Sequence, residues 1–382
     1  MSSSSPSRTH SWASFDGEGS GAPSPAPMSS GGSGGSSSSL VSSDASLTPF
    51  IKDRVIDGKA VAKTIQGEIA SEVSRLKDRY GRVPGLAVVI VGARKDSQTY
   101  VRMKKKACAD VGIASFEKCL PDTVSQEELL KFVRDFNSDK SVHGILVQLP
   151  LPKHIDESAV LAEISIEKDV DGFHPLNIGR LCMKGREPLF IPCTPFGCMQ
   201  LLERNNIKIK GANAVVVGRS NIVGLPAAML LLKRDASVTI VHSATQDMAS
   251  IVRRADIVIA AAGKTELIKK EWLKPGCVVI DVGTNGVEDK TKKTGYRLVG
   301  DVDFAGAKQV AAAVTPVPGG VGPMTIAMLL QNTLEGGKRD IEGTGSSSSS
   351  SSQPGWKKRA ISLARTVAAA AVGAWLAGGR GK

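Results

Sequence analysis

Acidic residues are missing from the last thirty positions of the chain (353–382), although the whole chain has a formal net charge of +12. Half of that charge comes from six basic residues in this segment: Lys357, Lys358, Arg359, Arg365, Arg380 and Lys382. The rest of the chain is therefore only mildly basic. Aromatic residues are also scarce, at 4%, and they are not interleaved with basic residues as in nucleic-acid-binding surfaces. We therefore expect no nucleic-acid partner.

Paired cysteines and clustered metal ligands are missing as well. The six cysteines stand at irregular spacings without a CxxC pair, which excludes zinc ribbons, dithiol redox motifs and a disulfide scaffold. His143, His154 and His174 show no ligand spacing either. We expect reduced cysteines, mostly in the core, and no metal site. We also expect no secretory signal, because the first apolar cluster comes late and is short.

Two stretches, 1–48 and 341–355, are rich in Ser and Gly and poor in apolar residues. Such stretches bury too little apolar surface to offset the entropy of ordering, so we predict a disordered extension and a flexible linker. We expect a cytoplasmic protein, and the Ser-rich start leaves a plastid or a mitochondrion as alternatives. The charged residues of this start fit a mitochondrial presequence poorly: Arg8, Asp16, Glu18 and Asp44.

The C-terminal tail, 356–382, is basic and Ala-rich. Its uncharged part, from Thr366 to Gly379, is shorter than the ~20 residues that a helix needs to span a bilayer. If Arg365 places its charge at the bilayer surface, the apolar stretch begins at Ala360 and approaches that length. The alternatives are therefore a membrane anchor or interfacial helix, and a basic extension that contacts nothing.

Short β-branched runs alternate with longer amphipathic segments through the centre of the chain. These runs lie at 86–92, 144–150, 213–218, 237–242, 256–263 and 277–283. Apolar strands separated by helical stretches indicate parallel sheets covered on both faces, so the fold class is α/β. The runs pause between 151 and 212, which predicts two lobes with a boundary near 192–195. They are an N-terminal domain at 49–194, completed by a helix at about 322–340, and a Rossmann-like domain at 195–321.

The stretch NAVVVGRSNIVGLPAAMLLL (213–232) predicts a strand, a tight turn and a helix that begins near Pro226. Gly218 and Gly224 bracket the turn, and the backbone N–H groups at the helix start are suited to a phosphate. The pattern departs from the usual GxGxxG, because Ser220 stands in place of the second glycine. Alone, such a turn indicates either a dinucleotide site or an ordinary structural turn.

The end of the next predicted strand distinguishes between NAD and NADP. A site for NAD places Asp or Glu there, where the carboxylate accepts from the ribose hydroxyls. This chain has His242, Ser243 and Thr245 instead, and Arg219 stands in the turn itself. A cation and hydroxyl groups at these places favour the 2′-phosphate of NADP. The alternative is that Arg219 is a solvated loop residue.

Three consecutive lysines occur in a stretch with helical periodicity, 100–112. At about 100° per residue, Lys104 lies on the same face as Tyr100 and Cys108, whereas Lys105 and Lys106 point elsewhere. A lysine on an apolar face loses hydration, which lowers its pKa toward the range that general acid–base chemistry uses. The alternative is that only its stem is buried and its ammonium group reaches water.

Six stretches stand out by their order and spacing: SQTYVRMKKKACADVGI (97–113), VHGILVQLPLP (142–152), EKDVDGFHPLNIGRL (167–181), IPCTPFGCMQLL (191–202), VVVGRSNIVGLPAAMLL (215–231) and TPVPGGVGPMTIAML (315–329). Together they resemble the bifunctional methylenetetrahydrofolate dehydrogenase/methenyltetrahydrofolate cyclohydrolases, the FolD family. The resemblance covers about 50–340, and QLPLP and PGGVGPMT are its most specific parts.

This resemblance implies a folate-binding catalytic lobe and an NADP-binding lobe with a cleft between them. The catalytic residues that it implies are Lys104, Tyr100, Gln148 and Asp171, and Tyr100 and Asp171 also bind substrate. The other implied substrate-binding residues are Pro318, Gly319, Gly322 and Thr325, although these glycines could serve only a tight turn. The implied cofactor-binding residues are Gly218, Arg219, Ser220, Ser243 and Thr284, and relatives commonly have isoleucine at position 284.

The resemblance also implies the activity. A bifunctional enzyme of this family oxidises 5,10-methylenetetrahydrofolate with NADP⁺ and hydrolyses the methenyl product to 10-formyltetrahydrofolate, and family members are commonly homodimers. One alternative is a monofunctional dehydrogenase, which the presence of Lys104 and Gln148 opposes. Another is a non-enzymatic scaffold tethered by its tail, which the intact site residues oppose.

Overall fold

A computed structural model describes residue 41 and residues 48–292 and 295–343. Nearly all of the predicted disordered extension, most of the predicted linker and the whole C-terminal tail lie outside the described residues. The predictions made for them therefore stay predictions. Among the described helices, none has both the length and the apolar composition of a membrane span.

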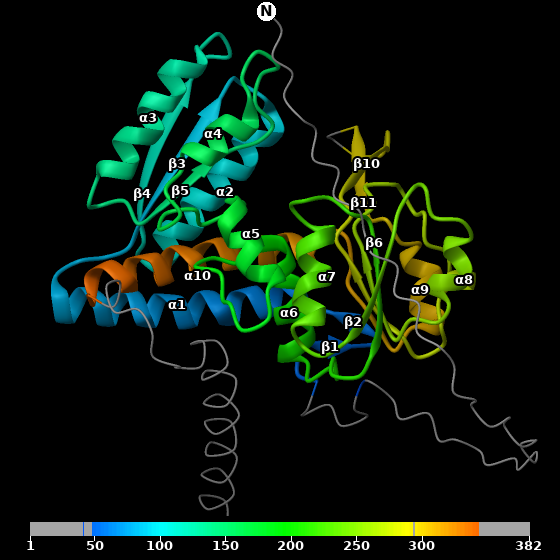
Figure 1. Cartoon of the computed structure of the whole chain (residues 1–382). Coiled ribbons are helices and arrows are strands. Elements are labelled where there is room, and N and C mark those ends of the chain that lie inside the picture. The colour runs from blue at the N-terminus through cyan, green and yellow to red at the C-terminus, as the bar shows by residue number, and fades with distance from the viewer. Residues whose placement is uncertain (1–40, 42–47, 293–294, 344–382) are drawn as a thin grey trace, which may run out of the picture. The chain divides into compact units, whose positions relative to one another are not determined.

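The N-terminal lobe is built on a parallel three-stranded sheet in the order β4-β3-β5 (Figure 1). Its strands are β3 (Gly85–Val91), β4 (Ala114–Leu120) and β5 (Gly144–Val147), and its helices are α2 (Lys95–Val111), α3 (Gln126–Ser138) and α4 (Glu157–Glu163). Alternate residues of β3 enter two different cores, with Val88 on the side of α2 and Val89 on the side of α3 and α4. This confirms the prediction of a parallel strand buried on both faces.

The second lobe is built on a seven-stranded sheet in the order β1-β2-β12-β9-β8-β6-β7. Six of these strands run parallel: β2 (Val55–Ile56), β6 (Asn213–Val217), β7 (Ser237–Val241), β8 (Ile257–Ala260), β9 (Val278–Asp281) and β12 (Ala313–Val314). The short hairpin of β1 (Ile51–Lys52) and β2 (Val55–Ile56) extends this sheet, because β2 pairs with β12. A segment near residue 50 thus completes the sheet of the second lobe, which the sequence pattern did not predict.

Helices and one separate hairpin surround this sheet. They are α7 (Gly224–Leu232), α8 (Met248–Val252), the 3-10 turn η1 (Lys270–Trp272), α9 (Phe304–Val310) and the hairpin of β10 (Asn285–Glu288) and β11 (Tyr296–Val299). The helix predicted to begin near Pro226 begins two residues earlier, at Gly224. The two α/β lobes confirm the predicted fold class.

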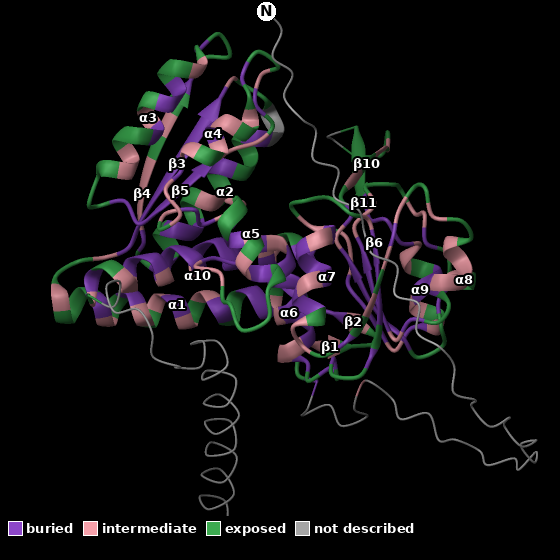
Figure 2. Ribbon diagram, in the orientation of Figure 1, coloured by how far each residue is buried: buried purple, intermediate pink, exposed green. Residues whose placement is uncertain are grey.

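Three helices pack against one another and share one apolar core with both lobes: α1 (Gly58–Tyr80), α6 (Cys193–Arg204) and α10 (Val321–Ile341). Apolar residues at every third or fourth position give α1 a buried stripe, formed by Val61, Ile65, Ile69, Val73 and Leu76. Figure 2 shows buried residues along both α1 and α10, which run side by side. Arg204 of α6 binds both carboxylate oxygens of Glu68 at 2.8 Å, which fixes α6 on α1.

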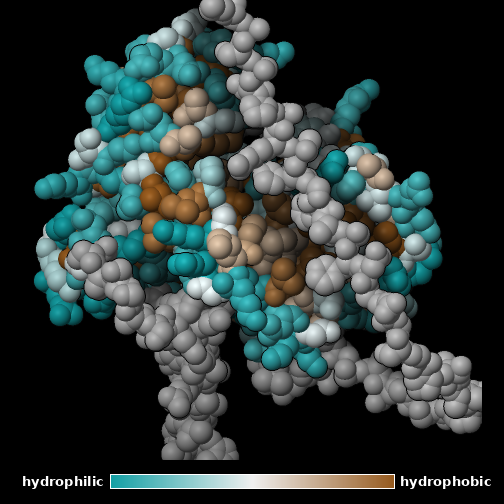
Figure 3. All heavy atoms as spheres, in the orientation of Figure 1, coloured by the Kyte–Doolittle hydropathy of each residue, from teal (hydrophilic) through white to brown (hydrophobic). Residues whose placement is uncertain are grey.

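The surface seen in Figure 3 is mainly hydrophilic at its edges, with apolar side chains gathered toward the middle of this face. The exposed large apolar residues include Leu176 of α5 (Pro175–Cys182), Met183 just after it, and Leu232 of α7. Single exposed apolar side chains are common on protein surfaces and require no separate explanation.

Candidate active site

Lys104 lies in the middle of α2, one turn before the fully buried Cys108. Its side chain is half-buried, whereas Lys105 and Lys106 are exposed. Lys105 forms a surface ion pair with Glu117 at 2.9 Å. The burial of the three lysines therefore follows the helical wheel, which separates Lys104 from its two neighbours.

Gln148 meets Lys104 from the end of β5. Lys104 Nζ donates to Gln148 Oε1 at 3.0 Å. Gln148 Nε2 donates to the backbone carbonyl of Leu149 at 2.9 Å, so the amide oxygen is the atom that faces the ammonium group. A side chain from a helix and a side chain from the carboxyl end of a strand are thus joined by one hydrogen bond.

Asp171 lies close enough to Lys104 for the two charges to interact, although no direct ion pair joins them within the described residues. Burial lowers the pKa of Lys104, and the negative charge of Asp171 partly offsets this effect. Burial raises the pKa of Asp171 to about 6, although the charge of Lys104 acts in the opposite direction. Both groups therefore titrate nearer to neutral pH than they do in water.

Asn332 of α10, which the sequence did not single out, joins the residue before Asp171 to the segment that ends at Ile191. Its Nδ2 donates to the carbonyl of Val170 at 2.7 Å and to that of Ile191 at 2.9 Å. Cys193 is buried beside them, with Sγ 3.3 Å from the carbonyl oxygen of Val170 and 4.0 Å from Asp171 Oδ1. Burial raises the pKa of Cys193 well above its ordinary value, so it acts here as a neutral thiol.

Asp169 supports the same turn from the other side. Its buried carboxylate accepts from the backbone N–H groups of Phe173 at 3.2 Å and His174 at 2.9 Å, and from Asn177 Nδ2 at 2.8 Å. Burial raises the pKa of Asp169, and these donors act against that rise. The KDVDG motif contains both aspartates, and the structure separates their surroundings: Asp169 is enclosed by donors, whereas Asp171 lies near Lys104.

The other predicted substrate-binding residues lie farther along the chain. Tyr100 stands one turn before Lys104 on α2 and exposes 44% of its surface. Pro318, Gly319 and Gly322 lie in and just after the turn that leads into α10, and Thr325 Oγ1 is 3.0 Å from Thr194 Oγ1 of α6. In the part of the chain that the structure describes, no hydrogen bond joins this turn or Thr325 to Lys104.

The turn after β6, which the sequence predicts to bind a phosphate, has a backbone conformation that requires glycine at position 218. Gly218 has a φ of 122°, and a Cβ there would lie 2.1 Å from the carbonyl oxygen of Ala261, so a larger residue does not fit. Ser220 Oγ accepts from the N–H groups of Val223 at 3.2 Å and Gly224 at 3.3 Å. Since a hydroxyl group has two acceptor sites and one donor, the Ser220 O–H can still donate to a ligand oxygen.

In the loop after β7, the structure distinguishes between the three candidate residues His242, Ser243 and Thr245. Thr245 Oγ1 accepts from the His242 N–H at 3.0 Å, and His242 Nδ1 accepts from the Ala244 N–H at 3.2 Å, so both side chains stabilise the loop itself. Ser243 and Arg219 are exposed. No carboxylate occurs between Val241 and Thr245, so an exposed cation and a hydroxyl fit a phosphate group better than a ribose diol. Thr284 is exposed just after β9.

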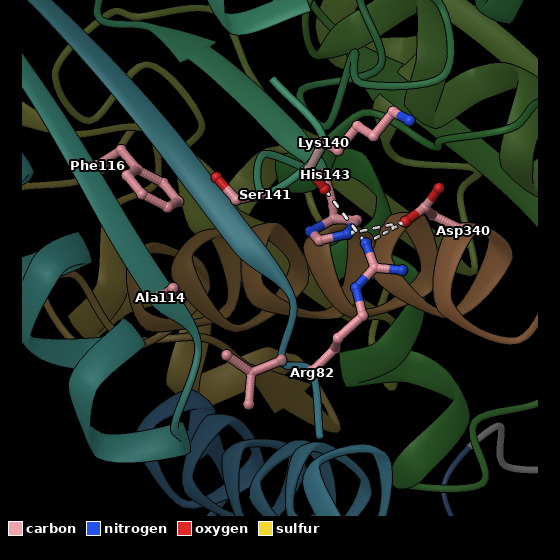
Figure 4. Close-up of a pocket in the computed structure, with 8 residues that line it drawn as sticks. Arg82, Ala114, Phe116, Lys140, Ser141, His143 and Asp340 are labelled. Carbon is pink, nitrogen blue, oxygen red and sulfur yellow. Dashed lines mark hydrogen bonds and ion pairs between the residues drawn. The ribbon is translucent and has the colours of Figure 1, made fainter. Parts of the chain in front are cut away.

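A separate cavity of about 710 Å³ lies at the opposite edge of the three-stranded sheet, where β3 and β5 begin. Figure 4 shows Arg82, His143 and Asp340 converging there. Arg82 Nη2 donates to Asp340 Oδ2 at 2.6 Å, and His143 Nε2 lies 3.3 Å from the same oxygen. His143 Nδ1 accepts from the Gly85 N–H at 2.9 Å, so these side chains connect the sheet to the end of α10. None of them was predicted as a site residue.

Metal binding has no support within residues 48–292 and 295–343, where no group of His, Cys, Asp and Glu could hold an ion.

The class of protein follows from the lysine site and the dinucleotide turn together. A glycine turn at the carboxyl edge of a parallel sheet and a desolvated lysine in a second α/β lobe are typical of a dinucleotide-dependent enzyme with its own acid–base group.

Comparison with protein families identifies the particular family. A model of the tetrahydrofolate dehydrogenase/cyclohydrolase catalytic domain matches residues 56–171, and a model of the NAD(P)-binding domain of the same family matches residues 192–341. The chain therefore belongs to the tetrahydrofolate dehydrogenase/cyclohydrolase family, which confirms the resemblance found in the sequence.

Individual relatives agree with this assignment. The chain is 67% identical over 286 residues to Bifunctional protein FolD 2 of Arabidopsis thaliana, which covers 75% of this chain and 96% of that protein. It is 64% identical over 285 residues to Bifunctional protein FolD 4, chloroplastic, of the same plant, covering 75% and 79% of the two chains. Among solved structures, the Trypanosoma brucei N5,N10-methylenetetrahydrofolate dehydrogenase-cyclohydrolase, complexed with NADP cofactor and inhibitor, has a TM-score of 0.73 and 51% identity, covering 77% of this chain and 98% of that one.

Proposed function

We propose that Lys104, Gln148 and Asp171 form the centre at which this enzyme carries out both reactions of its family. The enzyme oxidises 5,10-methylenetetrahydrofolate to 5,10-methenyltetrahydrofolate with NADP⁺ and then hydrolyses the product to 10-formyltetrahydrofolate. The observation that carries the proposal is the 3.0 Å hydrogen bond from Lys104 to Gln148, beside a carboxylate with a raised pKa. Both reactions change the same bridging carbon, so one centre serves both.

Lys104 is the acid–base group for hydrolysis. Burial lowers its pKa, which increases the fraction of neutral amine that can accept a proton from the attacking water. Gln148 holds the amine in place through its amide oxygen and leaves it without an added negative charge. A carboxylate at position 148 would favour the ammonium form, so a neutral acceptor suits this role.

Asp171 orients the folate. When ionised, it accepts hydrogen bonds from the amino-pyrimidine edge of the pterin, which is a charge-assisted contact that fixes the ring. Tyr100, with its exposed ring one turn away from Lys104, packs against the pterin or the aminobenzoate. The turn containing Pro318 and Gly319 covers the substrate together with Gly322 at the start of α10, and Thr325 contacts the substrate from the same helix.

NADP⁺ supplies the hydride acceptor when it is bound. Gly218 allows the backbone to approach the pyrophosphate, and the Ser220 O–H donates to it. Arg219 and Ser243 bind the 2′-phosphate, since both are exposed and no carboxylate competes at the end of β7. Thr284 lies at the nicotinamide end and contacts it through its backbone.

One pair of assays tests the function and its alternatives. Reduction of NADP⁺ with methylenetetrahydrofolate is measured beside hydrolysis of methenyltetrahydrofolate supplied directly. We expect both activities from the purified chain. Dehydrogenase activity alone would indicate the monofunctional alternative, and the absence of both would indicate a scaffold.

The domain division and the assembly are also proposals. We propose a catalytic domain at 49–194 completed by α10, an NADP-binding domain at 195–321, and a homodimer, as the family resemblance implies. Sedimentation of the purified chain tests the dimer, and a monomer at micromolar concentration would contradict it. The folate derivatives are its small-molecule partners.

The cellular compartment and any membrane contact depend on the terminal segments of the chain. Relatives include proteins named chloroplastic and mitochondrial, and we keep a cytoplasmic location as the proposal with these two as alternatives. For the tail at 356–382, we propose membrane contact. Fractionation of a reporter fused to residues 343–382 tests it, and a reporter recovered entirely without membranes would contradict it.

A further inference from the structure

Asp301 is a fully buried carboxylate that gathers four hydrogen-bond donors. Oδ2 accepts from the backbone N–H groups of Ala262 at 2.6 Å and Gly263 at 2.8 Å. Oδ1 accepts from the N–H of Lys264 and from Asn285 Nδ2, both at 2.9 Å. Among the described residues, no ion pair involves Asp301, and the four hydrogen-bond partners named here are all N–H donors.

A second buried carboxylate, Asp281 at the end of β9, holds the segment that carries Asp301. Its Oδ1 accepts from the N–H groups of Gly283 and Asp301 at 2.9 Å, and its Oδ2 accepts from that of Val302 at 3.0 Å. The fit is close, since a Cβ on Gly300 would lie 1.8 Å from Asp281 Oδ2. The two carboxylates therefore form one chain of contacts across the carboxyl edge of the sheet.

The segments fixed by this pair are those that surround the dinucleotide turn. Residues 261–264 follow β8, which pairs with β6, and the carbonyl oxygen of Ala261 is the atom that excludes a side chain at Gly218. Thr284 stands between Gly283, which Asp281 fixes, and Asn285, which Asp301 fixes. The Asp281–Asp301 pair thus determines the positions of two loops that border Gly218 and Thr284.

We propose that Asp281 and Asp301 are positioning residues for the nicotinamide side of the NADP site, so that dehydrogenase activity depends on them and cyclohydrolase activity does not. This inference rests on the proposed function. Neither carboxylate touches substrate in this proposal. They act by holding the loops at 261–264 and 282–285 against the dinucleotide turn, whereas Lys104 and Gln148 lie in the other lobe.

The test substitutes Asp301→Asn in the full-length enzyme. An amide has an N–H₂ group where the carboxylate has an acceptor oxygen, so at least two of the four donors would face another donor. We expect the KM for NADP⁺ to rise at least about tenfold, because the two loops would no longer be held against the dinucleotide turn and a misplacement of about 1 Å can cost about 100-fold. Hydrolysis of methenyltetrahydrofolate without NADP⁺ should stay within about twofold of the wild-type rate.

A matched control lies at the other edge of the same sheet. Asp256 accepts from the Asn213 N–H at 2.9 Å and from Lys274 Nζ at 2.5 Å, just before β8 begins. Asp256→Asn removes a carboxylate that also ties strands together but does not border the dinucleotide turn. We expect it to leave the ratio of the two activities at the wild-type value.

The outcomes are distinguishable. A parallel loss of both activities in Asp301→Asn would reduce the pair to an ordinary structural role, and an unchanged KM for NADP⁺ would overturn the proposal directly. If Asp301→Asn does not fold, Asn285→Ala removes a single donor to the same carboxylate and is judged by the same two measurements. Failure of the proposed function itself would appear separately, as missing activity in the wild-type enzyme.

Discussion

The hydrogen bond between Lys104 and Gln148 allows a quantitative test, because one substitution places a charge at a known distance. Gln148→Glu replaces the amide oxygen, 3.0 Å from Lys104 Nζ, with a carboxylate oxygen. Two opposite charges about 4 Å apart attract each other by about 4 kcal/mol at an effective dielectric constant of about 20. Desolvation of the new carboxylate offsets part of this attraction, and contacts of this kind commonly move a pKa by about 1 to 3 units.

The sign of the effect follows from the role proposed for the amine. A carboxylate at 148 favours the charged form of Lys104, so its pKa rises. Below that pKa the neutral fraction at a given pH then falls by about 10- to 1000-fold. If neutral Lys104 accepts the proton of the attacking water, the alkaline-rising limb of cyclohydrolase activity moves to higher pH by the same interval.

The assay follows the loss of methenyltetrahydrofolate absorbance across pH, corrected for uncatalysed hydrolysis. Lys105→Met serves as the control, because it removes a charge from the next position of α2, where the side chain is exposed and forms a surface ion pair with Glu117. The control should keep the wild-type profile. A Gln148→Glu profile that does not move, or that moves to lower pH, would refute the proposed role of Lys104.

Three further predictions concern other charged residues. Asp171→Asn should lower cyclohydrolase kcat/KM by about 10- to 100-fold, the effect of one hydrogen bond to a charged group, and should remove an acid limb near the pKa of about 6. Arg219→Ala should raise the KM for NADP⁺ but not that for NAD⁺, and a uniform rise would contradict a 2′-phosphate contact. Burial raises the pKa of Asp281 to about 7, so its contribution to folding is fully present below its unfolded pKa of about 3.9 and is lost as pH rises toward 7. The unfolding temperature of Asp281→Asn should therefore rise relative to that of the wild type as the pH increases across that interval. A constant difference between the two unfolding temperatures would contradict the raised pKa of Asp281.

The fold could be predicted to the extent that each strand carries its own apolar signal. The runs at 86–92 and 277–283 identify β3 and β9, since these strands are buried on both faces and their patterns are local. By contrast, β1 and β2 contain two residues each and belong to the sheet only because β2 pairs with β12 across more than 250 positions. β4 was also missed, because its partly exposed residues include Glu117 and Lys118. Such elements depend on tertiary pairing, which local patterns do not contain.

The site could be predicted in a similar, partial way. Helical periodicity separates Lys104 from Lys105 because both residues lie on one helix, where the position in the sequence determines the face. The burial of the two side chains in the structure follows that separation. The contact with Gln148 joins residues 44 positions apart, so only the family resemblance could suggest it. Asn332 and Asp301 have no signal of their own, since one is a polar residue in an apolar helix and the other is one more acid in a loop. Their roles become visible only in the structure, where Asn332 donates two hydrogen bonds to backbone carbonyls and Asp301 accepts hydrogen bonds from backbone N–H groups.

The role of Lys104 is tested most directly by Lys104→Met, with both activities measured on the same preparation. Methionine keeps the apolar stem and removes the amine, so packing on α2 changes little. We predict that hydrolysis of methenyltetrahydrofolate falls by at least about 100-fold, the usual contribution of a general acid–base group, while reduction of NADP⁺ persists. Hydrolysis at the wild-type rate would contradict the assignment of Lys104 as the acid–base group.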